Sequence, residues 1–269
     1  MPATRIALLA VFSLIALLPA GAKVNFNVIV PQREPQVRVS FSRIKHSEFK
    51  FEHYGVEHIK SDPVRGFQGI VSYYHPVTSK LALSLGLGMS SINGSFFYDF
   101  NAPLNHNLFP DANDHYQESC FTNNLFMLPM AVHYRHNILK KFRISASIEA
   151  GISINVHGNL KSEQGMLYIY SDQASGTEII SFIFELKKPR PIFNPSGFVK
   201  LGLVREAPNG NNIYLAFVAN YSPFSMRQGE YKFNYLYYDS YGAAKQYFNY
   251  IGIEVCYGII LFKGKDKSE

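Results

Sequence analysis

Histidine and serine are the residue types in this chain whose spacing could support nucleophilic catalysis. Ser153 and His157 fall four residues apart. In an extended strand that spacing separates them by roughly 13 Å, too far for a hydroxyl to pass its proton to an imidazole. The sequence alone assigns no serine or carboxylate partner to His133 or His136. We therefore predict that the chain is not an enzyme and interpret these histidines as polar residues of a wall or rim.

Metal and cofactor signatures are missing from the sequence as well. It contains no HExxH motif, no Walker loop, no GxSxG motif and no cysteine spacing of the zinc type. Residues 106–115 begin and end with histidine and include Asp111 and Asp114, so they could bind a metal in a loop, although a solvated loop is the simpler interpretation. We predict no catalytic, cofactor-binding or metal site.

A strict alternation of residue types organises the rest of the chain. In the sixteen residues 142–157, apolar residues alternate without exception with polar residues or glycine. Side chains of a strand point alternately to its two faces, so this stretch has one apolar and one polar face. A strand of a soluble protein is usually about 5–6 residues long, whereas a strand that spans a bilayer needs about 9–11. The run is typical of an outer-membrane barrel.

The same alternation recurs and predicts eight strands. These are residues 36–45, 66–75, 80–91, 123–135, 142–157, 196–205, 212–223 and 247–262. The connections between them alternate strictly between long and short, which is typical of long extracellular loops and short periplasmic turns. We predict an all-β fold, an eight-stranded antiparallel up-and-down transmembrane barrel that occupies residues 23–269.

Three further segments in the long connections are strand-like: residues 166–170, 178–185 and 230–238. They could add two spanning strands and give a ten-stranded barrel. However, the first is too short to span a bilayer and the second contains a stretch without alternation. We interpret them as extensions of the barrel wall above the membrane.

If the apolar alternates face lipid, four charged side chains face the interior: Arg143, Glu149, Lys200 and Glu254. The interior of an eight-stranded barrel is just filled by side chains. We therefore predict a closed, salt-bridged lumen without a diffusion pore; for any one of the four, an exposed rim position is the alternative. Glu149 lies six residues from Arg143 on one strand, so its partner must come from another strand, and Lys200 is the first candidate.

The N-terminus predicts export. Arg5 precedes the apolar residues 6–18, and an Ala-x-Ala pattern ends at Ala22. This segment is typical of a signal peptide cleaved after Ala22, with a membrane anchor as the alternative. No later stretch offers around 18 consecutive apolar residues, which excludes a bundle of membrane helices. We predict a protein of the Gram-negative cell envelope, located in the outer membrane.

Cysteine usage and net charge restrict the function only weakly. Cys120 and Cys256 could pair in an oxidising compartment. Cys120 is expected in a surface loop and Cys256 in the middle of the last strand, so two separate thiols are the alternative. The formal net charge of +6 is weak evidence for a nucleic-acid partner, and we predict none.

Several stretches resemble the PorT-like outer-membrane β-barrel family of Bacteroidota. The resemblance lies in GFQGIVSYYHP at residues 66–76 with SKL at 79–81, in LPMAVHYR at 128–135, in AGIS at 150–153, in residues 197–203, and in NYIGIE at 249–254. The first strand departs from the family because it lacks the usual glycines. The resemblance implies an eight-stranded outer-membrane barrel and does not imply membership of a secretion machine.

We therefore expect a non-enzymatic structural or interaction module that acts through surface loops, because long loops on a rigid scaffold often carry function. Its partners would be outer-membrane lipid and, through the loops, other envelope or secretion proteins. A lipid-modifying barrel enzyme and a narrow channel or small-ligand carrier are the alternatives.

Overall fold

The computed structural model describes residues 34–54, 59–99, 115–157, 163–172, 177–187, 193–207, 210–235 and 238–261. The chain divides into Met1–Val30 and Pro31–Glu269, and all described residues belong to the second unit. The predicted signal peptide and residues 106–114 of the histidine-containing stretch lie outside the described residues.

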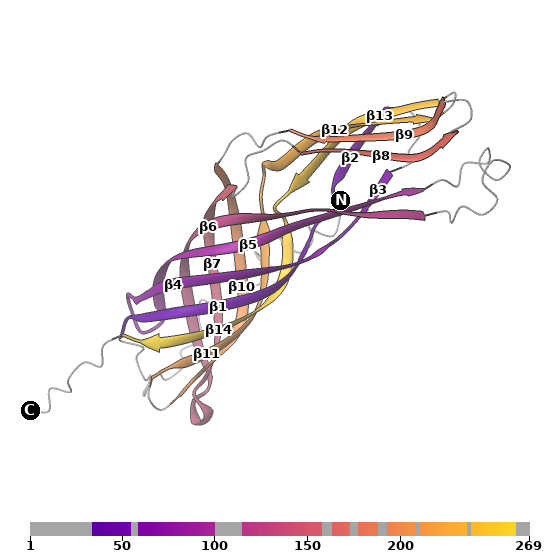
Figure 1. Ribbon diagram of the computed structural model, residues 1–269. Helices are drawn as coiled ribbons and strands as arrows, with labels where there is room; N and C mark the ends of the chain where they lie inside the picture. The colour runs from indigo at the N-terminus through magenta and orange to yellow at the C-terminus, as the bar shows by residue number, and fades with distance from the viewer. Residues whose placement is uncertain are drawn as a thin grey trace, which may run out of the picture. The chain divides into compact units, whose positions relative to one another are not determined.

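Eight antiparallel strands close into a barrel in the order β5-β4-β1-β14-β11-β10-β7-β6, and pairing of β5 with β6 completes the circle (Figure 1). The strands are β1 (Gln36–His46), β4 (Arg65–Pro76), β5 (Leu81–Asp99), β6 (His115–Leu139), β7 (Ile144–His157), β10 (Phe193–Glu206), β11 (Asn212–Tyr221) and β14 (Tyr250–Ile260). The prediction of an eight-stranded antiparallel barrel is confirmed.

Strands β5 and β6 are much longer than predicted. Their pairing continues past the alternating residues from Gly94↔Cys120 to Asp99↔His115. Cys120 therefore lies in a strand, and the expectation that it falls in a loop is wrong. The reason is that main-chain hydrogen bonds extend this hairpin where the sequence no longer alternates.

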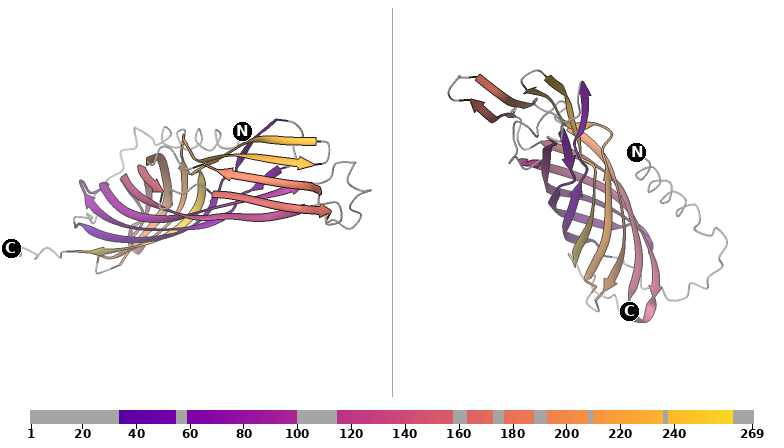
Figure 2. Two further views of the ribbon diagram at one scale, coloured as in Figure 1. Left: turned by 45° about the horizontal axis from the view of Figure 1, so that its top comes forward. Right: turned by 90° about the vertical axis from the view of Figure 1, so that its right-hand side faces the viewer.

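Most of the other strands form a second sheet. Its order is β2-β13-β12-β9-β8, and its strands are β2 (Lys50–Tyr54), β8 (Glu163–Asp172), β9 (Thr177–Leu186), β12 (Ser225–Tyr235) and β13 (Tyr238–Tyr247). All five come from the long connections between barrel strands, and Figure 2 shows both sheets in further views. β3 (Ile59–Asp62) pairs instead with the extended part of β5. The extra strands thus do not enlarge the barrel to ten strands.

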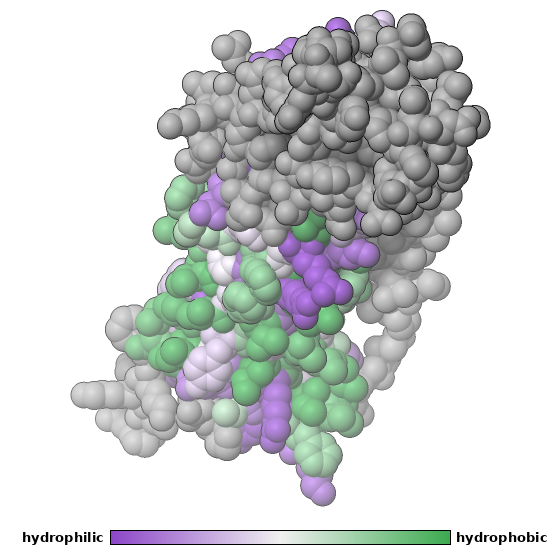
Figure 3. Space-filling model, turned by 45° about the vertical axis from the view of Figure 1, so that its right-hand side comes forward, coloured by the Kyte–Doolittle hydropathy of each residue, from purple (hydrophilic) through white to green (hydrophobic). Residues whose placement is uncertain are grey.

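The barrel turns its apolar side chains outward and its polar side chains inward. On β1, Phe41 is 58% exposed whereas Ser42 is 1% exposed; on β14, Ile253 is 60% exposed whereas Glu254 is 1% exposed. Hydrophobic side chains cover much of the described barrel surface in Figure 3. A soluble protein seldom exposes such a continuous apolar surface.

Turns join the barrel strands at the end where β1 begins. Gly210 has φ +86°, a left-handed conformation that glycine adopts without strain, and it is the glycine of an Asn-Gly pair of the kind that predicts a hairpin, here between β10 and β11. The 3-10 helix η1 (Lys140–Phe142) leads from β6 into β7. Among the described residues, no helix has the length and hydrophobicity required to cross a membrane.

Gly151 lets three neighbouring strands pack closely. A Cβ atom on Gly151 would lie 2.1 Å from the carbonyl oxygen of Met130 on β6 and 2.8 Å from Cζ of Phe198 on β10. The first contact is with backbone, which cannot move aside without breaking the sheet. A side chain at this position is therefore incompatible with the observed pairing of β6, β7 and β10.

We predict that Gly151→Ala destabilises the barrel by about 1–3 kcal/mol or more, the range typical of overpacking. Gly69→Ala is the matched control, because a Cβ on Gly69 meets nothing within 4 Å. Circular dichroism during denaturant unfolding in detergent micelles measures both variants. Equal stability of the two variants would contradict the close packing at Gly151.

Candidate functional site in the barrel interior

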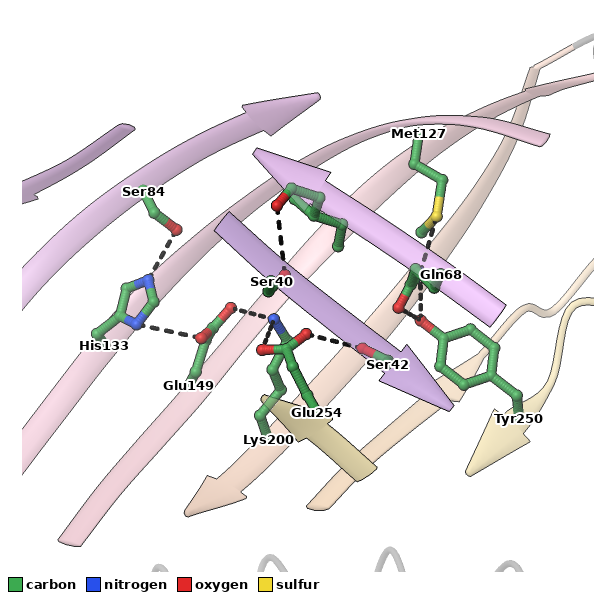
Figure 4. Close-up of polar contacts among 11 residues, drawn as sticks. Ser40, Ser42, Gln68, Ser84, Met127, His133, Glu149, Lys200, Tyr250 and Glu254 are labelled. Atoms are coloured by element: carbon green, nitrogen blue, oxygen red, sulfur yellow. Dashed lines mark hydrogen bonds and ion pairs between the residues drawn. The ribbon is translucent and has the colours of Figure 1, made fainter. Parts of the chain in front are cut away.

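A lysine between two carboxylates lies inside the barrel (Figure 4). Lys200 Nζ on β10 is 3.1 Å from Glu149 Oε1 on β7 and 2.9 Å from Glu254 Oε1 on β14. Lys200, Glu149 and Glu254 are 7%, 5% and 1% exposed. Each carboxylate is therefore paired with the ammonium in a place that solvent barely reaches, where an unpaired charge is costly.

Further polar contacts extend this group in both directions. The second oxygen of Glu149 is 3.2 Å from His133 Nδ1, and His133 Nε2 is 2.7 Å from Ser84 Oγ. At the other end, the Ser42 hydroxyl donates to Glu254 Oε2 at 3.1 Å. The chain Ser84–His133–Glu149–Lys200–Glu254–Ser42, here called the polar belt, draws one residue from each of six barrel strands.

Strand register explains how the polar belt forms. Glu149 is directly opposite Lys200 in the β7–β10 pair and opposite His133 in the β6–β7 pair. Directly opposite side chains lie within contact distance. Lys200 and Glu254 are separated by β11, which places Val218 beside Lys200 and Ala216 beside Glu254. Because these two side chains are short and uncharged, the lysine can reach across β11.

Arg143 does not join the other three predicted interior charges, and the expectation that it faces inward is wrong. It lies in the turn before β7, is exposed and has φ +53°. Its Nη1 donates to the carbonyl oxygen of Ala207 at 3.5 Å. The strand begins only at Ile144, so the alternation of faces does not extend back to Arg143.

Two interior arginines were missed in the sequence analysis. Arg38 is 4% exposed, and its guanidinium carbon lies 3.3 Å from the ring centre of Tyr74. The guanidinium carbon of Arg135 lies 5.3 Å from the same ring centre. Alternation could have found Arg38, because it falls between the outward residues Val37 and Val39.

Side chains fill the interior on both sides of the polar belt. Toward the start of β1, the Asn212 amide donates to Gln36 Oε1 at 2.6 Å. On the other side, the Gln68 amide donates to the Tyr250 hydroxyl at 3.0 Å. Beyond it, Ile44, Leu125 and Phe248 belong to a buried apolar cluster. This filling is what an eight-stranded barrel is expected to have.

Cys256 is a buried free thiol. It therefore forms no disulfide with Cys120, and of the two interpretations of the cysteines the structure supports separate thiols. Within the described part of the chain, no group of three or more His, Cys, Asp or Glu residues could hold a metal ion.

The second sheet carries exposed ion pairs. Lys245 on β13 contacts Glu52 on β2 at 2.6 Å, and Lys187 pairs with Glu230 on β12. The hydrogen bond to Glu230 raises the pKa of Lys187 above its ordinary value, and the hydrogen bond to Glu52 does the same for Lys245. Exposed pairs of this kind usually contribute about 0–1 kcal/mol.

Comparison with known proteins finds solved structures that are similar to this chain, but it assigns the chain to no family. No family model and no curated sequence matches the chain. The outer membrane protein OprG from Pseudomonas aeruginosa matches with TM-score 0.43 and 8% identity, covering 86% of this chain and 99% of that chain. Neisserial surface protein A matches with TM-score 0.38 and 9% identity, covering 82% and 96%. At these scores the likeness carries no argument about function, and the PorT-like resemblance stays a prediction.

We predict that Glu149→Gln destabilises the barrel. Breaking a buried ion pair costs about 3–5 kcal/mol, and we expect a loss at or below the lower end because Glu254 still holds Lys200. Glu230→Gln removes the same charge from an exposed pair and should change stability by about 0–1 kcal/mol. Denaturant unfolding followed by circular dichroism measures both free energies.

The double variant Glu149→Gln, Lys200→Met tests the pairing itself. Its loss of unfolding free energy should be smaller than the sum of the losses of the single variants, because each substitution alone leaves a buried charge with fewer partners. Losses that simply add would show that Glu149 and Lys200 do not interact.

Proposed function

We propose that this chain is an integral outer-membrane β-barrel protein that performs no catalysis and acts as a structural or interaction module. The observation that carries the proposal is the inversion of the barrel, with apolar side chains outside and a paired, charged interior. The barrel strands that alternation predicts are long enough to span a bilayer: β7 and β10 have 14 residues each and β14 has 11. A bilayer-spanning strand needs about 9–11.

Closure of the barrel supports the same proposal. In the hydrocarbon region of a bilayer, backbone groups have no water as a partner, so a sheet can span only if it has no free edge. Pairing of β5 with β6 removes the edge. The outward wall then faces lipid tails, which the exposed residues Leu87, Ile253 and Phe217 suit.

The second sheet is the part of the molecule that we assign to interactions. Its end strands in the described chain are β2 and β8. An end strand offers unpaired main-chain groups to which a partner can add a strand of its own. Other proteins of the cell envelope are the partners that this location would provide.

We predict that the mature protein begins at Lys23, fractionates with the outer membrane, and migrates faster on SDS gels when unheated than when boiled. The compact barrel resists SDS until heating, which is why its mobility depends on temperature. N-terminal sequencing and membrane fractionation measure these properties. Recovery in the soluble periplasm would overturn the proposal.

One observation favours a second candidate, a lipid-modifying enzyme. With His133 Nδ1 donating to Glu149, its Nε2 accepts from the Ser84 hydroxyl at 2.7 Å. This is the order of a nucleophile, a base and an orienting acid. An open groove of about 490 Å³ borders Ser84 and is lined mainly by apolar residues such as Leu85 and Val132. We rank this candidate second for two reasons. Glu149 also pairs with Lys200. The groove residues Leu85 and Val132 lie on the outer face of the barrel, whereas His133 is buried inside it.

A fluorophosphonate probe distinguishes the two candidates. We expect no labelling of the wild-type barrel, because an inward Ser84 that serves only as a hydrogen-bond partner is not an activated nucleophile. Ser153→Ala is the matched control for Ser84→Ala, since Ser153 is a buried serine bonded to Asn155 at 2.9 Å. Labelling that Ser84→Ala abolishes and Ser153→Ala preserves would reverse the ranking.

A further inference from the structure

Two arginines meet at one tyrosine ring inside the barrel. Arg38 on β1 and Arg135 on β6 both direct their guanidinium groups toward Tyr74 on β4. Arg38 is 4% exposed and Arg135 is half-buried. All three lie toward the end of the barrel where β1 begins, because Gln36 at the start of β1 is directly opposite Tyr74.

The same edge of each guanidinium has no hydrogen-bond partner among the described residues. In both Arg38 and Arg135, Nε and Nη2 are buried and unpaired. These two nitrogens form the side of the guanidinium that donates two parallel hydrogen bonds to a carboxylate or phosphate. Tyr74 offers each cation the face of an aromatic ring, and this contact leaves the Nε and Nη2 groups without a hydrogen-bond partner.

The acidic side chains nearby have other partners or make no ion pair. Glu149 and Glu254 are held by Lys200, with His133 and Ser42 on their remaining oxygens. Glu206 is half-buried and influences Arg135 electrostatically, but no ion pair between them is present in the described structure. Neither guanidinium therefore has an anion in contact among the described residues.

Two cations whose Nε and Nη2 groups are buried are unfavourable without an anion. A buried charge without a partner destabilises the fold, and placing a second cation at the same ring adds repulsion. The polar belt shows how the barrel treats a charge that it pairs from its own residues. The Arg38–Arg135 pair, in contrast, presents two donor forks that are hydrogen-bonded to no acceptor among the described residues.

We propose that Arg38 and Arg135 form a binding site for an oxyanion, the phosphate or carboxylate group of a ligand, inside the barrel near the end where β1 begins. The guanidinium groups bind its oxygens through their Nε and Nη2 donors, and Tyr74 holds both cations in place. This site goes beyond the proposed structural or interaction role, and it does not depend on which partner the second sheet binds.

Thermal unfolding of the purified barrel tests the site, with inorganic phosphate as the probe. The protein is held in zwitterionic detergent micelles at constant ionic strength while phosphate replaces chloride. A ligand that binds only the folded state raises the unfolding midpoint by an amount that grows with its concentration. We expect a rise of a few degrees for the wild type and none, beyond the general salt effect, for Arg38→Gln or Arg135→Gln.

Arg43→Gln is the matched control, because Arg43 lies on the same strand but is exposed. It should retain the full response to phosphate. Phosphate also stabilises folded proteins in general through exclusion from their surface, and that effect is common to all variants. An equal rise in every variant, including Arg38→Gln, would overturn the site.

One further variant and one further sample keep the result decisive. Arg38→Lys keeps the charge but loses the fork, so it should respond less than the wild type and more than Arg38→Gln; it also serves where Arg38→Gln does not fold. Micelles containing phosphatidylglycerol without free phosphate test a lipid headgroup as the source. A rise in the unfolding midpoint that requires Arg38, with either free phosphate or phosphatidylglycerol, supports the site. If neither sample shows an Arg38-dependent rise, the site is overturned.

Discussion

The inversion of the barrel is the constraint on which the rest of the structure depends. Because most apolar side chains of the barrel point outward, much of the interior is polar, and outside the buried apolar cluster it is held together by polar contacts. Charges enclosed in this way need partners with good geometry. The polar belt supplies them by directly opposed residues, and Lys200 reaches its second carboxylate only because Val218 and Ala216 on the intervening strand are short.

That constraint also explains how much of the fold the sequence could predict. All eight barrel strands were found, because a two-sided wall forces alternation over lengths that soluble strands rarely reach. Alternation says nothing of hairpins that continue on main-chain hydrogen bonds alone, and so the full lengths of β5 and β6 were not predicted. It also fails at a turn, where the left-handed conformation of Arg143 changes the direction of the side chain.

The candidate site was harder to predict than the strands. Local alternation is enough to place Glu149, Lys200 and Glu254 on the inner face of their strands. The pairing of Ser84 with His133, in contrast, depends on the relative register of β5 and β6, which no local pattern specifies. Arg38 lies in a run in which only Val37, Val39 and Phe41 alternate clearly. A single inward cation in such a run indicates no site until the barrel places it beside Arg135 and Tyr74.

The long connections are joined to one another by main-chain hydrogen bonds. The first of them supplies β2, which pairs with β13 of the fourth, and also β3, which pairs with the extended hairpin of the second. The third supplies β8 and β9, and β9 pairs with β12 of the fourth. Surface loops usually accept insertions and deletions independently. Here the insertion or deletion of one residue within any of these strands would shift a register that is shared with a neighbouring connection. Variation in length should therefore concentrate at the hairpin tips, and the four connections should diverge as a coordinated set.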